Sequence, residues 1–264
     1  MGRLRVVLVE PQGSRNLGSV ARVMKNMGVG HLVVVNPRCD PRDVEARHMA
    51  VHAQDVLDRA TVVSTLAEAL QGCDRTIGTL GRIHPTLPEW AIGDPRRDVP
   101  WLLAGQDAAL VFGPEDRGLS NQELALCQRQ VSIPTHPDYC SLNLAQAVGI
   151  CLYEVWLAQQ QPTTLAPGLP PTSPSTPVAS HNVMESFFGQ LQDLLLEIGY
   201  LSPQTQGRKM QKFRALFNRA QPSPAEVALL RGILRQWQWY TRHQITEAQR
   251  GEDQVPADPG LAEE

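Results

Sequence analysis

The sequence lacks the patterns that mark several common kinds of protein. Its five cysteines are odd in number and none is spaced C-x-x-C, so a disulfide framework is not expected and a reducing compartment fits best. No apolar run approaches the length of a membrane span, and the first run, residues 6–9, is too short for a secretory signal. P-loop and G-x-S-x-G patterns are also absent. We therefore expect a soluble, cytoplasmic protein.

Two weaker patterns point to a dinucleotide or a metal ion, and both are incomplete. Gly28-Val29-Gly30 precedes an apolar run, where a dinucleotide fingerprint must follow one, and the third glycine is missing. His48 and His52 have the i, i+4 spacing of a metal pair on a helix, but no convincing third ligand is nearby. A surface or packing role is the better reading of these histidines, and we expect no metal.

Charge is unevenly distributed along the chain. A net charge of -3 argues mildly against a nucleic-acid binder, because neutralising phosphates usually requires a basic balance. Residues 181–250, however, are rich in arginine and lysine, whereas the residues after Arg250 include acids and no bases. The average therefore hides a basic C-terminal module that ends in an acidic tail.

Short apolar runs alternate with helical stretches through the first 160 residues. The runs occupy residues 6–9, 32–35, 61–64, 76–80, 110–112 and 131–133. This alternation is typical of a parallel sheet covered by helices on both faces. Capping boxes that begin helices are expected at Thr65 and Ser120, and Asn16 is predicted to be the N-cap of a helix over residues 17–27. We predict an α/β domain over residues 1–160, with its ligand loops at the carboxyl ends of the strands.

The composition changes after residue 160. Residues 161–180 contain many prolines among serines and threonines and cannot bury enough apolar surface to fold. Helical periodicity resumes at residues 183–200 and 208–220, and Ser223-Pro224-Ala225-Glu226 is a capping box that begins a third helix. The predicted parts are a Pro-rich linker (161–180), a small all-helical domain (181–245) and an acidic disordered tail (246–264).

Three ordered motifs carry the chemistry. Residues 16–22 read NLGSVAR, residues 112–119 read FGPEDRGL, and residues 133–147 contain IP followed by SLNLAQA. The last two follow apolar runs and open helices, so both expose backbone amides at the same sheet edge. At these three places the chain resembles the SPOUT superfamily of RNA methyltransferases, in particular its TrmH-like branch of ribose 2'-O-methyltransferases.

The resemblance continues into the C-terminal module. Residues 199–201, 209–220 and 226–234 look like the helical extension of the TrmJ subfamily, which methylates the ribose at position 32 of the tRNA anticodon loop, on cytidine or uridine. That subfamily often has T-A-R after its fourth strand, whereas this chain has Thr-Leu-Gly-Arg at residues 79–82. A ribosomal RNA target, or a non-catalytic RNA-binding relative, are the alternatives.

The resemblance implies a cofactor and an unusual topology. The sheet is expected to thread a C-terminal trefoil knot, an exception to the rule that chains avoid knots, and the knot is expected to hold S-adenosylmethionine through backbone groups. The positions that match this role are Thr79, Leu80, Gly81, Gly113, Ile133, Ser141 and Leu142. Ser141 and Asn143 can equally be read as helix N-caps, and the two roles are compatible.

Catalysis is assigned by the same resemblance. A guanidinium is a poor general base, so Arg22 is expected to lower the effective pKa of the ribose 2'-hydroxyl and to stabilise the forming alkoxide. Ser141 would contact the ribose or orient Arg22. Asn16 and Glu115 would hold the loops in place, and Asn143 completes the predicted catalytic set.

The resemblance also implies partners. Arg22 would serve the cofactor of the opposite subunit, which makes the protein a homodimer. The apolar faces of residues 17–27 and 144–155 are candidates for the shared surface; alternatively they pack within one subunit. The residues expected to guide tRNA are Arg208, Lys209, Lys212 and Arg214, although a basic helix face is often only solvated.

Overall fold

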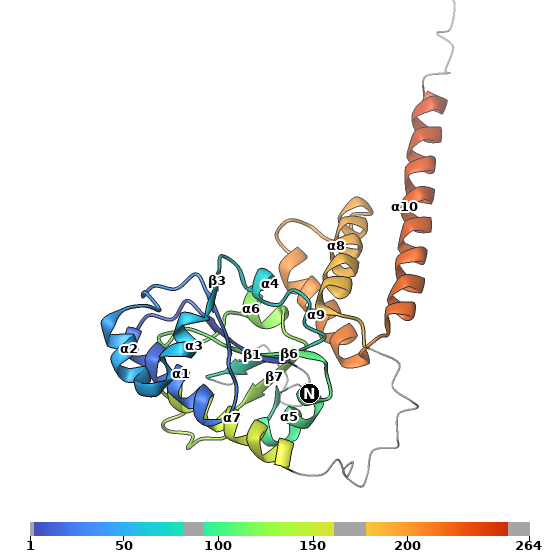
Figure 1. Cartoon of the computed structure of the whole chain (residues 1–264). Coiled ribbons are helices and arrows are strands. Elements are labelled where there is room, and N and C mark those ends of the chain that lie inside the picture. The colour runs from blue at the N-terminus through green and yellow to red at the C-terminus, as the bar shows by residue number, and fades with distance from the viewer. Residues whose placement is uncertain (1–2, 82–91, 161–177, 253–264) are drawn as a thin grey trace, which may run out of the picture.

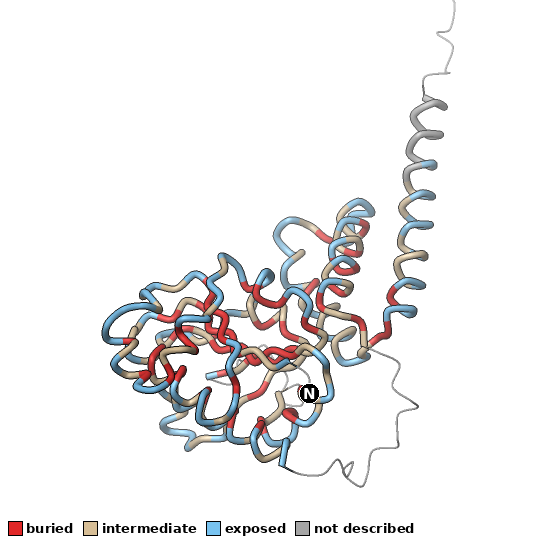
Figure 2. The backbone as a smooth tube through the Cα atoms, in the orientation of Figure 1, coloured by how far each residue is buried: buried red, intermediate tan, exposed pale blue. Residues whose placement is uncertain are grey.

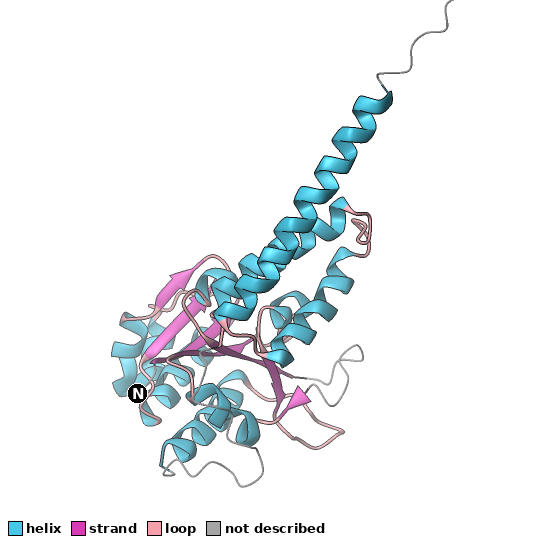
Figure 3. Ribbon diagram, turned by 90° about the vertical axis from the view of Figure 1, so that its right-hand side faces the viewer, coloured by secondary structure: helices cyan, strands magenta, loops and turns pink. Residues whose placement is uncertain are grey.

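The structure is a computed structural model that describes residues 3–81, 92–160 and 178–252. Its centre is one seven-stranded sheet in the order β3-β2-β1-β6-β4-β7-β5, paired in parallel (Figures 1 and 3). Each predicted apolar run overlaps a strand, and β5 is the strand that the sequence did not reveal. The strands are β1 (Arg3–Val9), β2 (His31–Val35), β3 (Thr61–Val63), β4 (Arg75–Leu80), β5 (Ile92–Gly93), β6 (Asp107–Phe112) and β7 (Arg129–Ser132).

Helices cover both faces of the sheet. Alternate residues of each strand point to opposite faces, and in the central strands both sets are apolar and must be buried. Val6 and Leu8 belong to a core shared with α1, α2, α3, α5 and α7, whereas Val7 and Val9 belong to a second core under α4 and α6 (Figure 2). The helices of this domain are α1 (Ser14–Asn26), α2 (Val44–Ala50), the 3-10 turn η1 (Val51–Ala53), α3 (Gln54–Asp58), α4 (Leu66–Ala69), α5 (Pro95–Leu103), α6 (Asn121–Ala125) and α7 (Leu144–Gln160).

Helix starts agree with the local sequence at Thr65, Ser120 and Ser223, where Ser223 forms its capping box with Glu226, and differ at Asn16. Thr65 caps α4 by accepting a hydrogen bond from the Glu68 amide at 3.2 Å, and Ser120 forms the predicted capping box of α6. The prediction that Asn16 caps α1 is wrong, because α1 begins at Ser14 with Gly13 as its N-cap. Asn16 lies in the first turn of the helix, where its side chain contacts other loops.

The two histidines spaced for a metal do not share a helix. His48 lies in α2, which ends at Ala50. The next residue, Val51, has a positive φ of 55°, and the chain changes direction there. His52 lies in the following turn, η1. Among the described residues, no group of three histidine, cysteine, aspartate or glutamate side chains is placed to hold a metal ion.

The apolar faces of α1 and α7 pack against each other within one subunit. On α1, Leu17 and Met24 are fully buried, as are Val148 and Leu152 on α7. Of the two alternatives that helical spacing left open for these faces, the structure shows packing within one subunit. The exposed apolar residues of α7 lie elsewhere on the helix: Ile150, Tyr153 and Trp156.

The C-terminal helices have a core of their own. Helices α8 (His181–Glu197), α9 (Gln206–Ala220) and α10 (Pro224–Glu252) enclose a cluster in which the rings of Phe187 and Phe217 lie 4.8 Å apart. Helix α10 projects away from the sheet and continues past the predicted boundary at residue 245 (Figure 1). Residues 161–177 and 253–264, which contain most of the predicted linker and tail, lie outside the described residues.

The helical part meets the α/β part through specific hydrogen bonds. The His181 amide donates to the Cys73 carbonyl at 2.9 Å, and Asn218 donates to the Cys127 carbonyl at 3.3 Å.

No helix in the described ranges is both long and apolar enough to cross a membrane. The predicted fold class, a parallel α/β sheet followed by a small helical part, is confirmed.

Close packing of α1 on α2 gives a stability prediction. A Cβ at Gly18 would lie 2.1 Å from the Ala46 carbonyl oxygen, so Gly18→Ala should lower the free energy of unfolding by about 1–3 kcal/mol through overpacking. The matched control is Gly189→Ala in α8, where no described atom lies within 4 Å of the added Cβ. The control should gain up to about 1 kcal/mol from helix propensity. Urea unfolding of both variants tests this, and equal effects would contradict it.

Candidate functional site

The residues predicted to hold a cofactor converge at one edge of the sheet. Thr79 and Leu80 end β4 and Gly81 follows it, Gly113 follows β6, and Ile133 follows β7. These strands are neighbours in the order β6-β4-β7, so their carboxyl ends lie side by side. Open α/β sheets bind ligands at such an edge. Ser141 and Leu142 precede α7, on the segment that follows β7.

Backbone geometry at this edge suits a ligand that is held by main-chain groups. No described atom lies within 4 Å of a Cβ built on Gly81. Gly113 is required for a different reason: a Cβ there would lie 2.2 Å from the Gly118 carbonyl carbon. The loop after β6 closes on itself, with the Gly118 amide donating to the Pro114 carbonyl at 2.9 Å. Main-chain groups of these loops are the ones that would hold S-adenosylmethionine.

A hollow of about 270 Å³ lies on the other half of the same edge. Its walls include Glu10, Asn36, Thr65 and Glu123, and they include none of the predicted cofactor residues. The predicted cofactor residues thus lie at the ends of β6, β4 and β7 and not at this hollow. The segment 82–91, which follows Gly81 in the chain, lies outside the described residues.

The Glu115 carboxylate lies beneath the N-terminus of α1. It accepts hydrogen bonds from the Gln12 amide at 3.0 Å, the Gly13 amide at 3.2 Å and the Asn16 side-chain amide at 2.8 Å. Backbone N–H groups at a helix N-terminus have no partner within the helix, and the helix dipole favours a negative charge there. Glu115 therefore ties the loop after β6 to the loop after β1.

Asn143 extends this network to the third motif. Its side-chain amide donates to Asn16 Oδ1 at 2.9 Å, and its own oxygen accepts from the Ala145 amide at 2.9 Å, which caps α7. Capping and tertiary contact are thus combined in one side chain. A continuous chain of hydrogen bonds, Glu115 to Asn16 to Asn143, joins the three sequence motifs.

Arg22 and Ser141 take no part in the hydrogen-bond network of Glu115, Asn16 and Asn143. Arg22 is exposed on α1, about 9 Å along the helix axis from Asn16, since each residue advances the helix by about 1.5 Å. Its side chain forms no hydrogen bond or ion pair with any residue that the structure describes. Ser141 is exposed two positions before Asn143. The structure therefore brings Glu115, Asn16 and Asn143 together and leaves the other two predicted catalytic residues facing solvent.

The basic residues of α9 divide into two kinds. Arg214 pairs with both oxygens of Glu185 and stacks on the Phe188 ring at 4.5 Å. Lys209 donates to the Tyr200 carbonyl at 2.7 Å. Arg208 and Lys212, by contrast, are exposed. Two of the residues expected to guide RNA thus also hold the helical part together.

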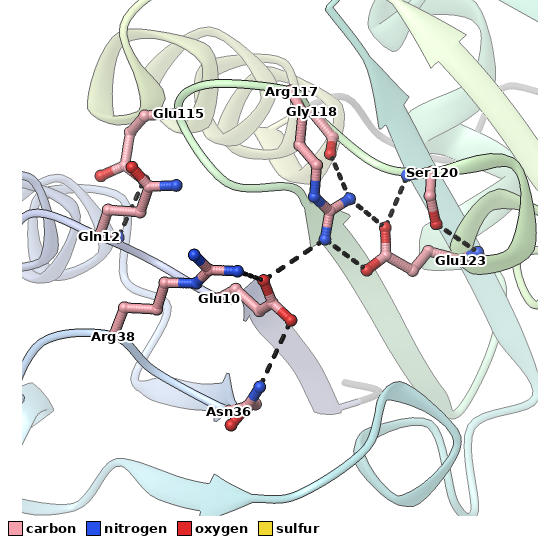
Figure 4. Close-up of polar contacts among 9 residues, drawn as sticks. All are labelled: Glu10, Gln12, Asn36, Arg38, Glu115, Arg117, Gly118, Ser120 and Glu123. Carbon is pink, nitrogen blue, oxygen red and sulfur yellow. Dashed lines mark hydrogen bonds and ion pairs between the residues drawn. The ribbon is translucent and has the colours of Figure 1, made fainter.

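Sequence reasoning missed an ionic cluster around Glu10, which follows β1 (Figure 4). Arg38 donates to Glu10 Oε2 at 2.7 Å, Asn36 donates to Oε1 at 3.3 Å, and an Arg117 nitrogen lies 3.6 Å from Oε2. The hydrogen bond from Arg38 holds the pKa of Glu10 below its ordinary value, although burial acts in the opposite sense. Its partners lie far away in the sequence, so no local pattern could have revealed this cluster.

The α/β part and the helical part each match a known family model. Residues 3–153 match the SpoU rRNA Methylase family, and residues 182–251 match the C-terminal domain of the tRNA methyltransferase TrmJ. The tRNA (cytidine/uridine-2'-O-)-methyltransferase TrmJ of Cronobacter sakazakii is 44% identical over 239 residues, covering 88% of this chain and 94% of the relative. Its counterpart in Escherichia coli O6:K15:H31 is 43% identical over 238 residues, covering 88% and 93%.

Solved structures of methyltransferases are also similar to this chain along most of its length. TrmJ from Z. mobilis ZM4 has a TM-score of 0.76 at 28% identity, covering 89% of this chain and 98% of that one. A probable methylase family protein from Haemophilus influenzae Rd KW20 has a TM-score of 0.58 at 31% identity, covering 93% and 99%. With three methyltransferase motifs joined at one sheet edge and relatives that align along most of its length, the chain belongs to the SpoU methylase family and carries a TrmJ-type C-terminal domain.

Proposed function

We propose that this protein transfers a methyl group from S-adenosylmethionine to the ribose 2'-hydroxyl of cytidine or uridine at position 32 of the tRNA anticodon loop. The observation that carries the proposal is the network from Glu115 through Asn16 to Asn143, because it unites all three methyltransferase motifs. Relatives at 43–44% identity are named tRNA (cytidine/uridine-2'-O-)-methyltransferases. The TrmJ-type C-terminal domain favours tRNA over ribosomal RNA as the substrate.

The cofactor would be held by the loops after β4, β6 and β7, which are also the segments that we expect to form the knot. S-adenosylmethionine supplies a methyl group activated by a positively charged sulfur. Thr79, Leu80 and Gly81 would contribute from one loop and Ile133 from another. Gly113 and the pair Ser141 and Leu142 would complete the pocket. Much of the rate enhancement would come from aligning donor and acceptor, since effective molarities are large for well-oriented groups.

Arg22 would act on the acceptor hydroxyl. Its fixed positive charge would lower the effective pKa of the 2'-hydroxyl and stabilise the alkoxide as the proton leaves to a phosphate, a water or another group. Ser141 would contact the ribose or orient Arg22. The Glu115–Asn16–Asn143 network would hold α1 and the loop before α7 in the required relative position.

The active site would be shared between two subunits of a homodimer. Arg22 is displaced along α1 from the network of its own subunit, which supports a role in the partner's site. Since the buried faces of α1 and α7 are already used inside the subunit, the exposed residues Ile150, Tyr153 and Trp156 of α7 are the better candidates for the shared surface. A self-complementary apolar patch of this kind suits a two-fold interface.

The helical part would bind the body of the tRNA. Arg208 and Lys212 are exposed on α9 and available to phosphates, whereas Lys209 and Arg214 would contribute while also contacting Tyr200 and Glu185. Such binding should weaken as salt rises, because each phosphate contact releases counterions.

The substrate proposal predicts a mapped methylation site. Purified protein, labelled S-adenosylmethionine and unmodified tRNA transcripts should give transfer to the ribose at position 32, located by nuclease mapping. A transcript with a 2'-deoxyribose at that position is the matched control and should accept nothing. Transfer only to ribosomal RNA, or no transfer to either RNA, would contradict the proposal.

The proposed role of Arg22 predicts a selective loss of chemistry. Arg22→Ala should bind S-adenosylmethionine normally, yet lose on the order of 10²- to 10³-fold in methylation rate, as for removal of one preorganised donor. Arg59→Ala removes the same charge from the exposed end of α3 and should keep wild-type activity. Single-turnover kinetics and calorimetric cofactor titration separate the two effects. Normal turnover by Arg22→Ala would refute this role.

The shared site predicts complementation between two inactive variants. Gly81→Val should block cofactor contact, and no described atom lies within 4 Å of the Cβ that it adds; Arg22→Ala should fail in chemistry. Co-expression should form heterodimers in which one site is intact, restoring about a quarter of wild-type activity for random pairing in a two-fold dimer. Light scattering should give about twice 29.1 kDa. An active monomer, or no recovery on mixing, would rule out a site shared between subunits.

A further inference from the structure

Two neighbouring strands end in an unusual backbone conformation. Glu10 follows β1 with a φ of 45°, and Asn36 follows β2 with a φ of 44°. They are adjacent in space, since Val9 pairs with Val35. Asparagine adopts this left-handed region fairly often, whereas glutamate seldom does. Strained residues of this kind persist where the surroundings hold them, and they concentrate at functional sites.

The Glu10 side chain contacts the loops that follow two other strands, β2 and β6 (Figure 4). It extends from the end of β1 and reaches Asn36 and Arg38 after β2 and Arg117 after β6. Both guanidinium groups approach the same oxygen, Oε2, at 2.7 Å for Arg38 and 3.6 Å for Arg117. The side chain of Glu10 is 21% exposed, but those of Arg38 and Arg117 are 60% and 39% exposed, so solvent partly screens these contacts.

Arg117 links Glu10 to the loop that carries Glu115. It also pairs with both oxygens of Glu123, at 2.8 and 3.1 Å, and donates to the Gly118 carbonyl at 3.0 Å. Glu10 lies two residues before Gln12, and Arg117 lies two residues after Glu115. The contacts therefore close a ring in which Glu115 holds the Gln12 amide and Arg117 holds Glu10.

The negative charge of the Glu10 carboxylate offsets the repulsion between the positive charges of Arg38 and Arg117. Without it, the guanidinium groups of Arg38 and Arg117 would face each other with no anion between them, and like charges repel. Glu123 balances Arg117 from its other side but does not contact Arg38. We expect the loop after β6 to move away from β1 in that case, which would lengthen the bonds of Glu115 to the start of α1.

We propose that Glu10 is a positioning residue for methyl transfer: its bridge to Arg38 and Arg117 holds Glu115 against α1, and thereby keeps Asn16 and Asn143 in register. The role rests on the proposed function. Glu10 does not touch the reacting atoms and acts through Arg117 and Glu115. An isolated exposed ion pair would contribute little, but this bridge connects two loops that each carry a motif.

The test begins with Glu10→Gln, which preserves the shape and removes the charge. Glutamine has one acceptor oxygen, so Asn36 or the arginines must face an amide donor. The rate of single-turnover methylation should fall roughly 10- to 100-fold, the scale of a misplaced active site, with little change in the KM for tRNA. The control is Asp58→Asn, which breaks the exposed pair with Arg47 (2.6 Å) and should leave the rate unchanged.

A double-mutant cycle separates positioning from general stability. Arg117→Ala should reproduce the loss of rate, and Glu10→Gln with Arg117→Ala should be little slower than either single variant, because both break the same bridge. Additive losses that track the melting temperature would mean a merely structural role and would overturn the proposal.

Hydrogen exchange gives a readout that is independent of activity. The amides of Gln12 and Gly13, which donate to Glu115, should exchange on the order of tenfold faster in Glu10→Gln and at the wild-type rate in Asp58→Asn. Unchanged exchange in Glu10→Gln overturns the proposal whatever the enzyme assay gives. If the wild-type protein fails to methylate tRNA, the proposed function fails, and the exchange measurement still decides whether Glu10 holds this loop.

Discussion

The site depends on one carboxylate placed against one helix end. Glu115 accepts hydrogen bonds from two backbone amides at the start of α1 and from the side-chain amide of Asn16. Those amides immediately precede α1 and have no partner within the helix, so the carboxylate supplies the acceptor that they lack. A single side chain thus satisfies the helix, fixes the loop after β6 and orients Asn16 toward Asn143. The helix that carries Arg22 is anchored by the same contact.

The architecture separates positioning from contact with the substrate. Glu115, Asn16 and Asn143 bind one another, and the cluster around Glu10 holds the same loops from the side of β1 and β2. Arg22, Ser141, Arg208 and Lys212 are exposed. The residues that join the loops are therefore different from the residues proposed to meet the substrate. Such a division is expected where a large, flexible substrate must meet a preorganised centre.

Local features were the part of the fold that could be predicted. The strands and the caps at Thr65, Ser120 and Ser223 depend on residues within a few positions of each other. The start of α1 was misplaced because Asn16 contacts Glu115, a distant residue that no local rule includes. The two-residue strand β5 was too short to give a pattern. The apolar stripes on α1 and α7 were identified, but not which partner buries them.

The candidate site was predicted only as far as its motifs extend. The motif residues Asn16, Glu115 and Asn143 do come together, but the bonds between them could not be read from spacing. The Glu10 cluster lay outside the motifs. Its ion pairs join residues whose adjacency follows from the strand order, with β1 between β2 and β6, and that order is a property of the assembled sheet.

The hydrogen bonds of the network also have a consequence for folding kinetics. Asn16 and Glu115 are separated by 99 positions, and Asn143 and Asn16 by 127. Contacts between such distant segments close large loops, and they form only after the intervening chain has been ordered. The network should therefore be among the last features to form. A chain released early during synthesis, with β1 to β3 already paired, would have part of a sheet and no catalytic centre.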